Sequence, residues 1–141
     1  MASGSKGLRV LLAEDESLAA LVVGDALTEL GHAVVHAADG ETALGIAAAL
    51  PFDVLITDLA MPRLSGLELI PLLRADRPDL PVVMMTGWLP PAGAQLLAEA
   101  GESPTALLLK PFALTQLAEA LARVALPATA PAGGAMAGGR V

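Results

Sequence analysis

Four apolar runs in this sequence each end in residues that could take part in chemistry. In chain order, the runs are followed by an acidic group, an aspartate, a hydroxyl and an ammonium group. Two or three carboxylates can bind a hard divalent cation such as Mg²⁺, which also takes phosphate oxygens as ligands. A hydroxyl and an ammonium group can then bind further phosphoryl oxygens. The candidate groups are Glu14-Asp15-Glu16, Asp58, Thr86 and Lys110.

The elements that must position these groups are the apolar runs themselves. They cover residues 8–13, 54–57, 82–85 and 106–109, and a further strand is predicted at 33–37. A parallel strand covered on both faces is a continuous apolar run. Helical patterns alternate with these strands, which predicts an α/β fold with a doubly wound, five-stranded parallel sheet and helices on both faces. Ligands of such sheets bind at the carboxyl ends of the strands, so the candidate groups should meet there.

Each candidate residue also has an ordinary structural explanation. Asp58 could be a turn residue or a helix cap, because aspartate is common in both positions. The acidic group could stabilise the start of the following helix, since negative charge is favourable there. Thr86 could be a turn residue and Lys110 a solvated surface charge. Their shared position, at the same end of successive strands, favours a functional site.

Several helix boundaries are visible in the sequence. Gly31 should end the first helix, and Asp39 and Ser65 should begin the second and third. Pro71 falls inside the third helix, where it removes a hydrogen bond to Leu67 and should bend the helix. The fifth helix carries one apolar stripe, formed by Leu114, Leu117, Leu121 and Val124.

The motifs together resemble those of the receiver domains of two-component response regulators. They occur in the order typical of that family and cover residues 8 to about 126. The resemblance implies a flavodoxin-like topology with strand order 2-1-3-4-5 in a domain spanning residues 8–126. The motifs are Glu14-Asp15-Glu16, Asp58-Leu59-Ala60-Met61-Pro62, Ser65-Gly66-Leu67-Glu68, Thr86-Gly87 and Lys110-Pro111-Phe112.

The resemblance implies a role for each of the matched residues. Asp58 would be the phosphate acceptor, Thr86 would bond the phosphoryl group, and Lys110 would bridge that group to the acidic pocket. A cis peptide bond between Lys110 and Pro111 would aim the lysine into the pocket. The domain would take its phosphoryl group from a histidine kinase or a histidine phosphotransfer protein and signal to a downstream protein partner. It would catalyse only its own phosphorylation and dephosphorylation.

The same resemblance implies that Mg²⁺ is the cofactor. Its ligands would be the carboxylates of Glu14, Asp15 and Asp58, helped by the backbone carbonyl of Ala60. Mg²⁺ would offset the repulsion between the carboxylate nucleophile and the incoming phosphoryl group.

The sequence departs from the family three residues before the lysine. Receivers usually carry Tyr or Phe there, whereas this chain has Leu107. Leucine has no ring that could turn between the surface and the interior, so we expect activation by an aromatic switch to be absent or weak. Any signal should instead pass through the loop from Thr86 to Trp88 and the start of the fourth helix at Pro90-Pro91.

Composition narrows the class of protein further. The chain has 141 residues, a net charge of -7 and no cysteine. This acidic balance argues against a nucleic-acid-binding surface, and no apolar stretch is long enough to predict a membrane helix. We expect a cytoplasmic protein that is a monomer or a weak homodimer. Residues 1–7 are interpreted as a flexible leader, and residues 127–141, which are mostly Ala, Gly and Pro, as a disordered tail.

Three alternatives remain at the level of sequence. A haloacid-dehalogenase-like phosphatase also uses an aspartate nucleophile and Mg²⁺, but its nucleophile normally follows the first strand and has a second aspartate two residues later, where this chain has Ala60. A nucleotide- or flavin-binding module is disfavoured because no glycine-rich phosphate-binding motif is present. A receiver excised from a hybrid histidine kinase stays open. His32 and His36 are interpreted as structural residues, since no partner ligand lies near them in sequence.

Overall fold

The computed structural model of the protein describes residues 7–101 and 103–129. Strands and helices alternate along this part of the chain, as the sequence predicts. The strands are β1 (Arg9–Ala13), β2 (Ala33–Ala37), β3 (Val54–Asp58), β4 (Val82–Thr86) and β5 (Thr105–Leu109). The helices are α1 (Ser17–Glu29), α2 (Gly40–Ala49), α3 (Gly66–Asp76), α4 (Pro91–Ala98) and α5 (Leu114–Thr129).

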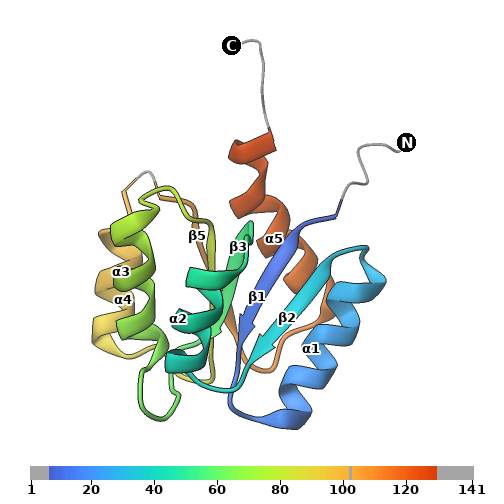
Figure 1. Ribbon diagram of the computed structural model, residues 1–141, viewed down its shortest axis with the longest axis horizontal. Helices are drawn as coiled ribbons and strands as arrows, with labels where there is room; N and C mark the ends of the chain where they lie inside the picture. Colours follow the sequence, from blue (N-terminus) through green and yellow to red (C-terminus); the bar gives the residue numbers. More distant parts are fainter. Residues whose placement is uncertain (1–6, 102, 130–141) are drawn as a thin grey trace.

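The five strands form one parallel sheet in the order β2-β1-β3-β4-β5, which confirms the predicted topology. Helices α1 and α5 cover one face of the sheet, and α2, α3 and α4 cover the other (Figure 1). The chain runs from β1 outward to β2 and then returns to β3 on the other side of β1. The strand order therefore reverses between β1 and β3, and the carboxyl ends of these two strands border the crevice where such sheets bind ligands.

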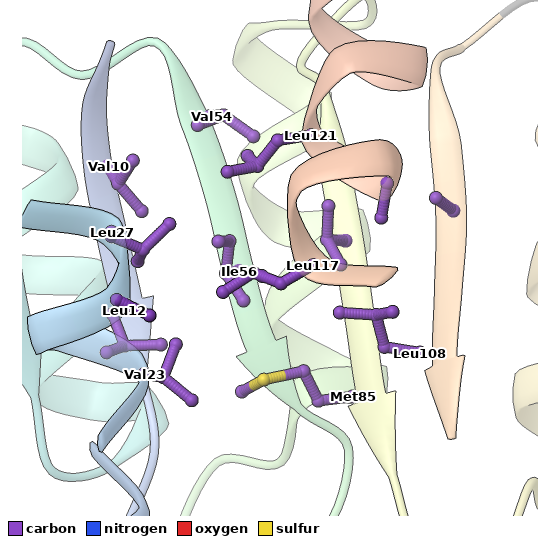
Figure 2. Packing of buried hydrophobic residues seen from close by; sticks show 14 of the residues in the cluster. Val10, Leu12, Val23, Leu27, Val54, Ile56, Met85, Leu108, Leu117 and Leu121 are labelled. Atoms are coloured by element: carbon purple, nitrogen blue, oxygen red, sulfur yellow. The ribbon is translucent and has the colours of Figure 1, made fainter. Parts of the chain in front are cut away.

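Two apolar layers hold the sheet rigid. Every residue of β3 and β4 is buried, which explains why these strands are visible as apolar runs in the sequence. On the α1 and α5 face, Ile56 and Met85 of the sheet pack with Leu117 of α5 (Figure 2). A fully buried side chain of this size stabilises the fold by about 1.5–3 kcal/mol. The strand ends are thus fixed points from which side chains can project.

The predicted helix starts are confirmed in detail. The side chain of Asp39 accepts a hydrogen bond from the N–H of Thr42 at 2.7 Å and caps α2. Ser65 and Glu68 form a reciprocal capping box at the start of α3. Gly31 has a φ of 96°, a left-handed conformation that suits glycine at the end of α1. Pro71 does lie inside α3, as predicted.

Helix α5 departs from the simplest interpretation of its sequence at both ends. Leu114 belongs to the predicted apolar stripe but is 54% exposed, because it is the first residue of the helix. The other three members of the stripe are buried. The helix runs to Thr129 and so extends past residue 126, and the predicted domain boundaries stay a prediction. The remainder of the predicted tail and residues 1–6 of the predicted leader lie outside the described residues.

Within residues 7–101 and 103–129, none of the helices combines the length and apolar character needed to cross a membrane.

Candidate functional site

The carboxyl edge of the sheet brings Glu14, Asp58 and Lys110 into direct contact. Glu14 follows β1, Asp58 is the last residue of β3, and Lys110 follows β5. The Lys110 ammonium donates to Glu14 Oε1 at 2.9 Å and to Asp58 Oδ2 at 2.8 Å. Glu14 is 0% exposed and Asp58 is 7% exposed, whereas the lysine side chain keeps some contact with solvent. Residues far apart in sequence thus form one partly buried charge cluster.

The backbone around Asp58 fixes the direction of its carboxylate. The N–H of Ala60 donates to Asp58 Oδ1 at 3.0 Å, and the N–H of Leu59 donates to the carbonyl of Met85 in β4 at 3.0 Å. Gly66, the first residue of α3, packs so closely on this segment that a Cβ there would collide with the carbonyl oxygen of Asp58. One oxygen of Asp58 is therefore held by its own loop and the other by Lys110.

The charges in the cluster perturb one another. Burial raises the pKa of Glu14 above its ordinary value, although hydrogen bonds from Lys110 and the N–H of Glu16 oppose this effect. Burial alone would lower the pKa of Lys110, but its hydrogen bonds to Asp58 and Glu14 outweigh burial and raise that pKa. Lys110 therefore stays protonated and compensates the two carboxylates.

A third carboxylate completes an acidic group. Glu14, Asp15 and Asp58 each offer a ligand oxygen, and these oxygens lie within 4.8 Å of one another. Asp15 is exposed, so the group opens to solvent on one side. Hard oxygen donors at this spacing fit a small divalent cation such as Mg²⁺, which also keeps several waters. The predicted carboxylate ligands thus lie together, and Ala60 lies beside them with its N–H bonded to Asp58.

Thr86 ends β4 next to the end of β3, and its hydroxyl is engaged within its own loop. The hydroxyl donates to the carbonyl of Trp88 at 2.7 Å and accepts from the N–H of Trp88 at 3.3 Å. Thr86 is buried, whereas the Trp88 side chain is 69% exposed. The hydroxyl is therefore bonded to the backbone of Trp88, while the indole ring of that residue lies at the surface.

The peptide bond between Lys110 and Pro111 is cis, as predicted. Beside Lys110, a groove of about 690 Å³ runs from Glu14 along α1. Its wall includes Leu18 and Val22 of α1 and Phe112 of the loop before α5. The charge cluster therefore lies at one end of a mostly apolar groove.

The arrangement defines a class of protein: a flavodoxin-like α/β domain with an acidic group and a lysine in contact at the carboxyl edge of its parallel sheet. Residues 10–122 match the model of the response regulator receiver domain, and the chain belongs to this family. It is thus a receiver domain with a phosphoacceptor role in two-component signalling.

Known relatives agree with this assignment. The chain is 34% identical over 116 residues to the transcriptional regulatory protein QseB of Haemophilus influenzae, a match that covers 81% of this chain and 51% of QseB. The chain thus spans about half the length of that relative.

Solved structures show the same fold. The chemotaxis protein CheY4 of Vibrio cholerae is 32% identical with a TM-score of 0.76, and the match covers 84% of this chain and 98% of CheY4. The response regulator TrrA of Thermotoga maritima, solved with Mg²⁺ and BeF, is 24% identical with a TM-score of 0.70. That match covers 82% of this chain and 97% of TrrA and shows the fold alone.

Proposed function

We propose that Asp58 is the phosphate acceptor and that its donor is a phosphohistidine on a histidine kinase or a histidine phosphotransfer protein. The contact of Asp58 Oδ2 with Lys110 at 2.8 Å supports this role most directly. It places a nearly buried carboxylate at the switch point of the sheet with a cation in position to hold a phosphoryl oxygen. Asp53 and Asp39 lack such a setting, because their carboxylates are engaged with Arg9 and with the start of α2.

In the proposed transfer, an oxygen of Asp58 forms a bond to phosphorus while the phosphorus–nitrogen bond of the phosphohistidine breaks. The histidine nitrogen leaves with the bonding electron pair, and Asp58 becomes an acyl phosphate. Water later attacks the phosphorus, which releases inorganic phosphate and regenerates the carboxylate. The protein supplies mainly position and charge for these steps.

Mg²⁺ is the proposed cofactor, because three carboxylates gather at the site. Glu14, Asp15 and Asp58 would hold it, with the backbone carbonyl of Ala60 as a further ligand. Bound Mg²⁺ would neutralise negative charge that builds up between the carboxylate and the phosphoryl oxygens.

Thr86 and Lys110 are proposed to bind the phosphoryl group after transfer. The Thr86 hydroxyl can donate to a phosphoryl oxygen only by giving up its hydrogen bond to the carbonyl of Trp88. Phosphorylation would therefore release the backbone of Trp88 and shift the loop that leads into α4. This exchange of one hydrogen bond for a charge-assisted one biases the loop toward a second position.

The output is proposed to be a contact with a downstream protein, and the domain acts on no substrate other than its own phosphoryl group. A dehalogenase-like phosphatase fits poorly, because the residue two positions after Asp58 is Ala60, which offers no acid for a leaving group.

The test is labelling with acetyl phosphate in the presence of Mg²⁺, followed by intact-mass measurement. We expect one added phosphoryl group in the wild type, none in Asp58→Ala, and one in the control Asp53→Ala. Undiminished labelling of Asp58→Ala would show that another residue is the acceptor. Trp88 fluorescence gives a second measurement of changes at the site, since Trp88 is the only tryptophan of the sequence and lies two residues from Thr86.

A further inference from the structure

Glu14 is fixed by four separate hydrogen bonds from different parts of the fold. Its carboxylate accepts from Lys110 at 2.9 Å and from the N–H of Glu16 at 3.1 Å. Its backbone N–H donates to the carbonyl of Ala37 at 3.0 Å. Its backbone carbonyl oxygen lies 2.7 Å from Nε2 of His36, whose side chain comes from β2. The lysine and Glu16 contacts belong to the charge cluster, whereas the last two come from the neighbouring strand.

The contact from His36 has a defined direction. A carbonyl oxygen can only accept a hydrogen bond, so Nε2 of His36 must carry the proton and donate it. The contact lies just beyond the paired strands, because β1 ends at Ala13 and β2 ends at Ala37. Beyond these residues the strands make one more backbone hydrogen bond, from the N–H of Glu14 to the carbonyl of Ala37, and among the described residues the Glu14 carbonyl is contacted by the imidazole of His36.

The ring of His36 borders a groove at this place. The groove has a volume of about 320 Å³ and is lined by residues of β1, α1 and β2, among them Leu12, Gly24 and His36. The contact at 2.7 Å shows that an imidazole from the edge strand β2 reaches the first residue after β1.

We propose that His36 is a positioning residue for the acidic loop. By holding the backbone of Glu14 from β2, it sets the direction of the Glu14 carboxylate and of Asp15, which follows at once. Groups that orient metal ligands from behind tune the affinity of the site without touching the metal. The inference rests on the proposed Mg²⁺ site, and it adds a residue that the receiver motifs do not contain.

The chain provides a matched control in its second histidine. His32 lies just before β2, and its Nδ1 accepts a hydrogen bond from the N–H of Leu8 at 3.0 Å. The same kind of ring thus bridges the same two chain segments at the amino end of the sheet, away from the acidic loop. A change at His32 should perturb packing between these segments but leave the carboxylates in place.

The experiment measures Mg²⁺ affinity by amide NMR titration of the wild type, His36→Leu, His36→Gln and His32→Leu at one pH. Leucine removes the donor, whereas glutamine returns an N–H at about the position of Nε2. We expect His36→Leu to weaken Mg²⁺ binding by about twofold to tenfold, the range for loss of one hydrogen bond. His36→Gln should recover most of this loss, and His32→Leu should bind Mg²⁺ like the wild type. Nitrogen shifts of the His36 ring should show the Nε2–H tautomer.

Wild-type affinity in His36→Leu, or no recovery in His36→Gln, would overturn the positioning role. An equal loss in His32→Leu would also overturn it, because the effect would then be general packing. Failure of the wild type to bind Mg²⁺ or to be labelled would instead count against the proposed function, so the two failures are distinguishable.

Discussion

Replacing Lys110 by methionine would remove the cation that lies between two carboxylates. Methionine keeps most of the aliphatic stem of the side chain, so the change acts mainly on charge. Glu14 would then be left 0% exposed, with only the N–H of Glu16 still donating to its carboxylate among the described residues. An uncompensated buried charge of this kind is strongly destabilising.

Protonation of Glu14 limits the cost. A carboxyl group with an ordinary pKa of 4.5 can be neutralised at about 1.36 kcal/mol per pH unit, which gives about 3.4 kcal/mol at pH 7 and about 1.4 kcal/mol at pH 5.5. Because the lysine side chain is 27% exposed, solvent should replace part of the lost interaction. We therefore expect a loss of about 1–3 kcal/mol at pH 7. The direction of the pH dependence follows from the raised pKa of Glu14 in the folded state. The free energy of unfolding falls as pH rises through that pKa, and it falls more steeply in Lys110→Met than in the wild type.

Urea unfolding followed by circular dichroism at the two pH values measures this loss. Arg9→Met is the control, because Arg9 pairs with Asp53 at an exposed position on the opposite edge of the sheet. Saturating Mg²⁺ should reduce the cost of Lys110→Met, since a bound cation compensates the same carboxylates. The reasoning is refuted if Lys110→Met costs the same free energy at pH 5.5 and pH 7, or no more than Arg9→Met does.

Three further outcomes are expected. Gly24→Ala should raise the free energy of unfolding by about 0.5–1 kcal/mol, because nothing lies within 4 Å of the added Cβ in α1. Gly66→Ala should lower the melting temperature, because its Cβ would collide with the backbone of Asp58. A stabilising Gly66→Ala together with a destabilising Gly24→Ala would contradict the packing described. The hydrogen bond from the Arg9 side chain lowers the pKa of Asp53, so its stabilisation is lost as pH falls through that lowered pKa, and acid titration of Asp53→Asn should show a shallower loss of stability than the wild type. Beryllofluoride should shift amides around Trp88 and the start of α4 in both wild type and Leu107→Ala, and a silent Leu107→Ala would show that residue 107 is the switch.

Much of the fold is predictable because burial leaves a direct mark on the sequence. The central strands are covered on both faces, and so each is a continuous apolar run that ends where the sheet ends. The caps at Asp39 and Ser65 are local hydrogen bonds and are visible within four residues of sequence. The residues of the charge cluster are predictable in the same way, since each follows a strand that the sequence identifies.

Features that depend on contacts between distant segments are not visible in this way. The stripe on α5 predicts which residues share a face, but it does not show that Leu114, as the first residue of the helix, is exposed. The contact of His36 with Glu14 depends on the register between β1 and β2, which pairs Leu12 with His36. No pattern within β2 reveals that register. The complete burial of Glu14 likewise follows from how β2 and Lys110 enclose it.

The close approach of Gly66 to Asp58 makes the loop between β3 and α3 tightly packed, in contrast to the segment between β4 and α4. In the first of these loops, α2 packs equally closely, because a Cβ on Gly40 would collide with the carbonyl of Leu64. The loop between β3 and α3 is thus clamped by backbone at both ends. On the other side, a Cβ on Gly87 would meet nothing within 4 Å, and one on Gly93 would meet side-chain atoms of Leu59, Leu89 and Pro90 rather than backbone. Strain introduced at Asp58 should therefore pass more easily into the segment that leads into α4 than into the loop between β3 and α3. Variation that retunes the signal should therefore accumulate in that segment, while the loop between β3 and α3 tolerates little change.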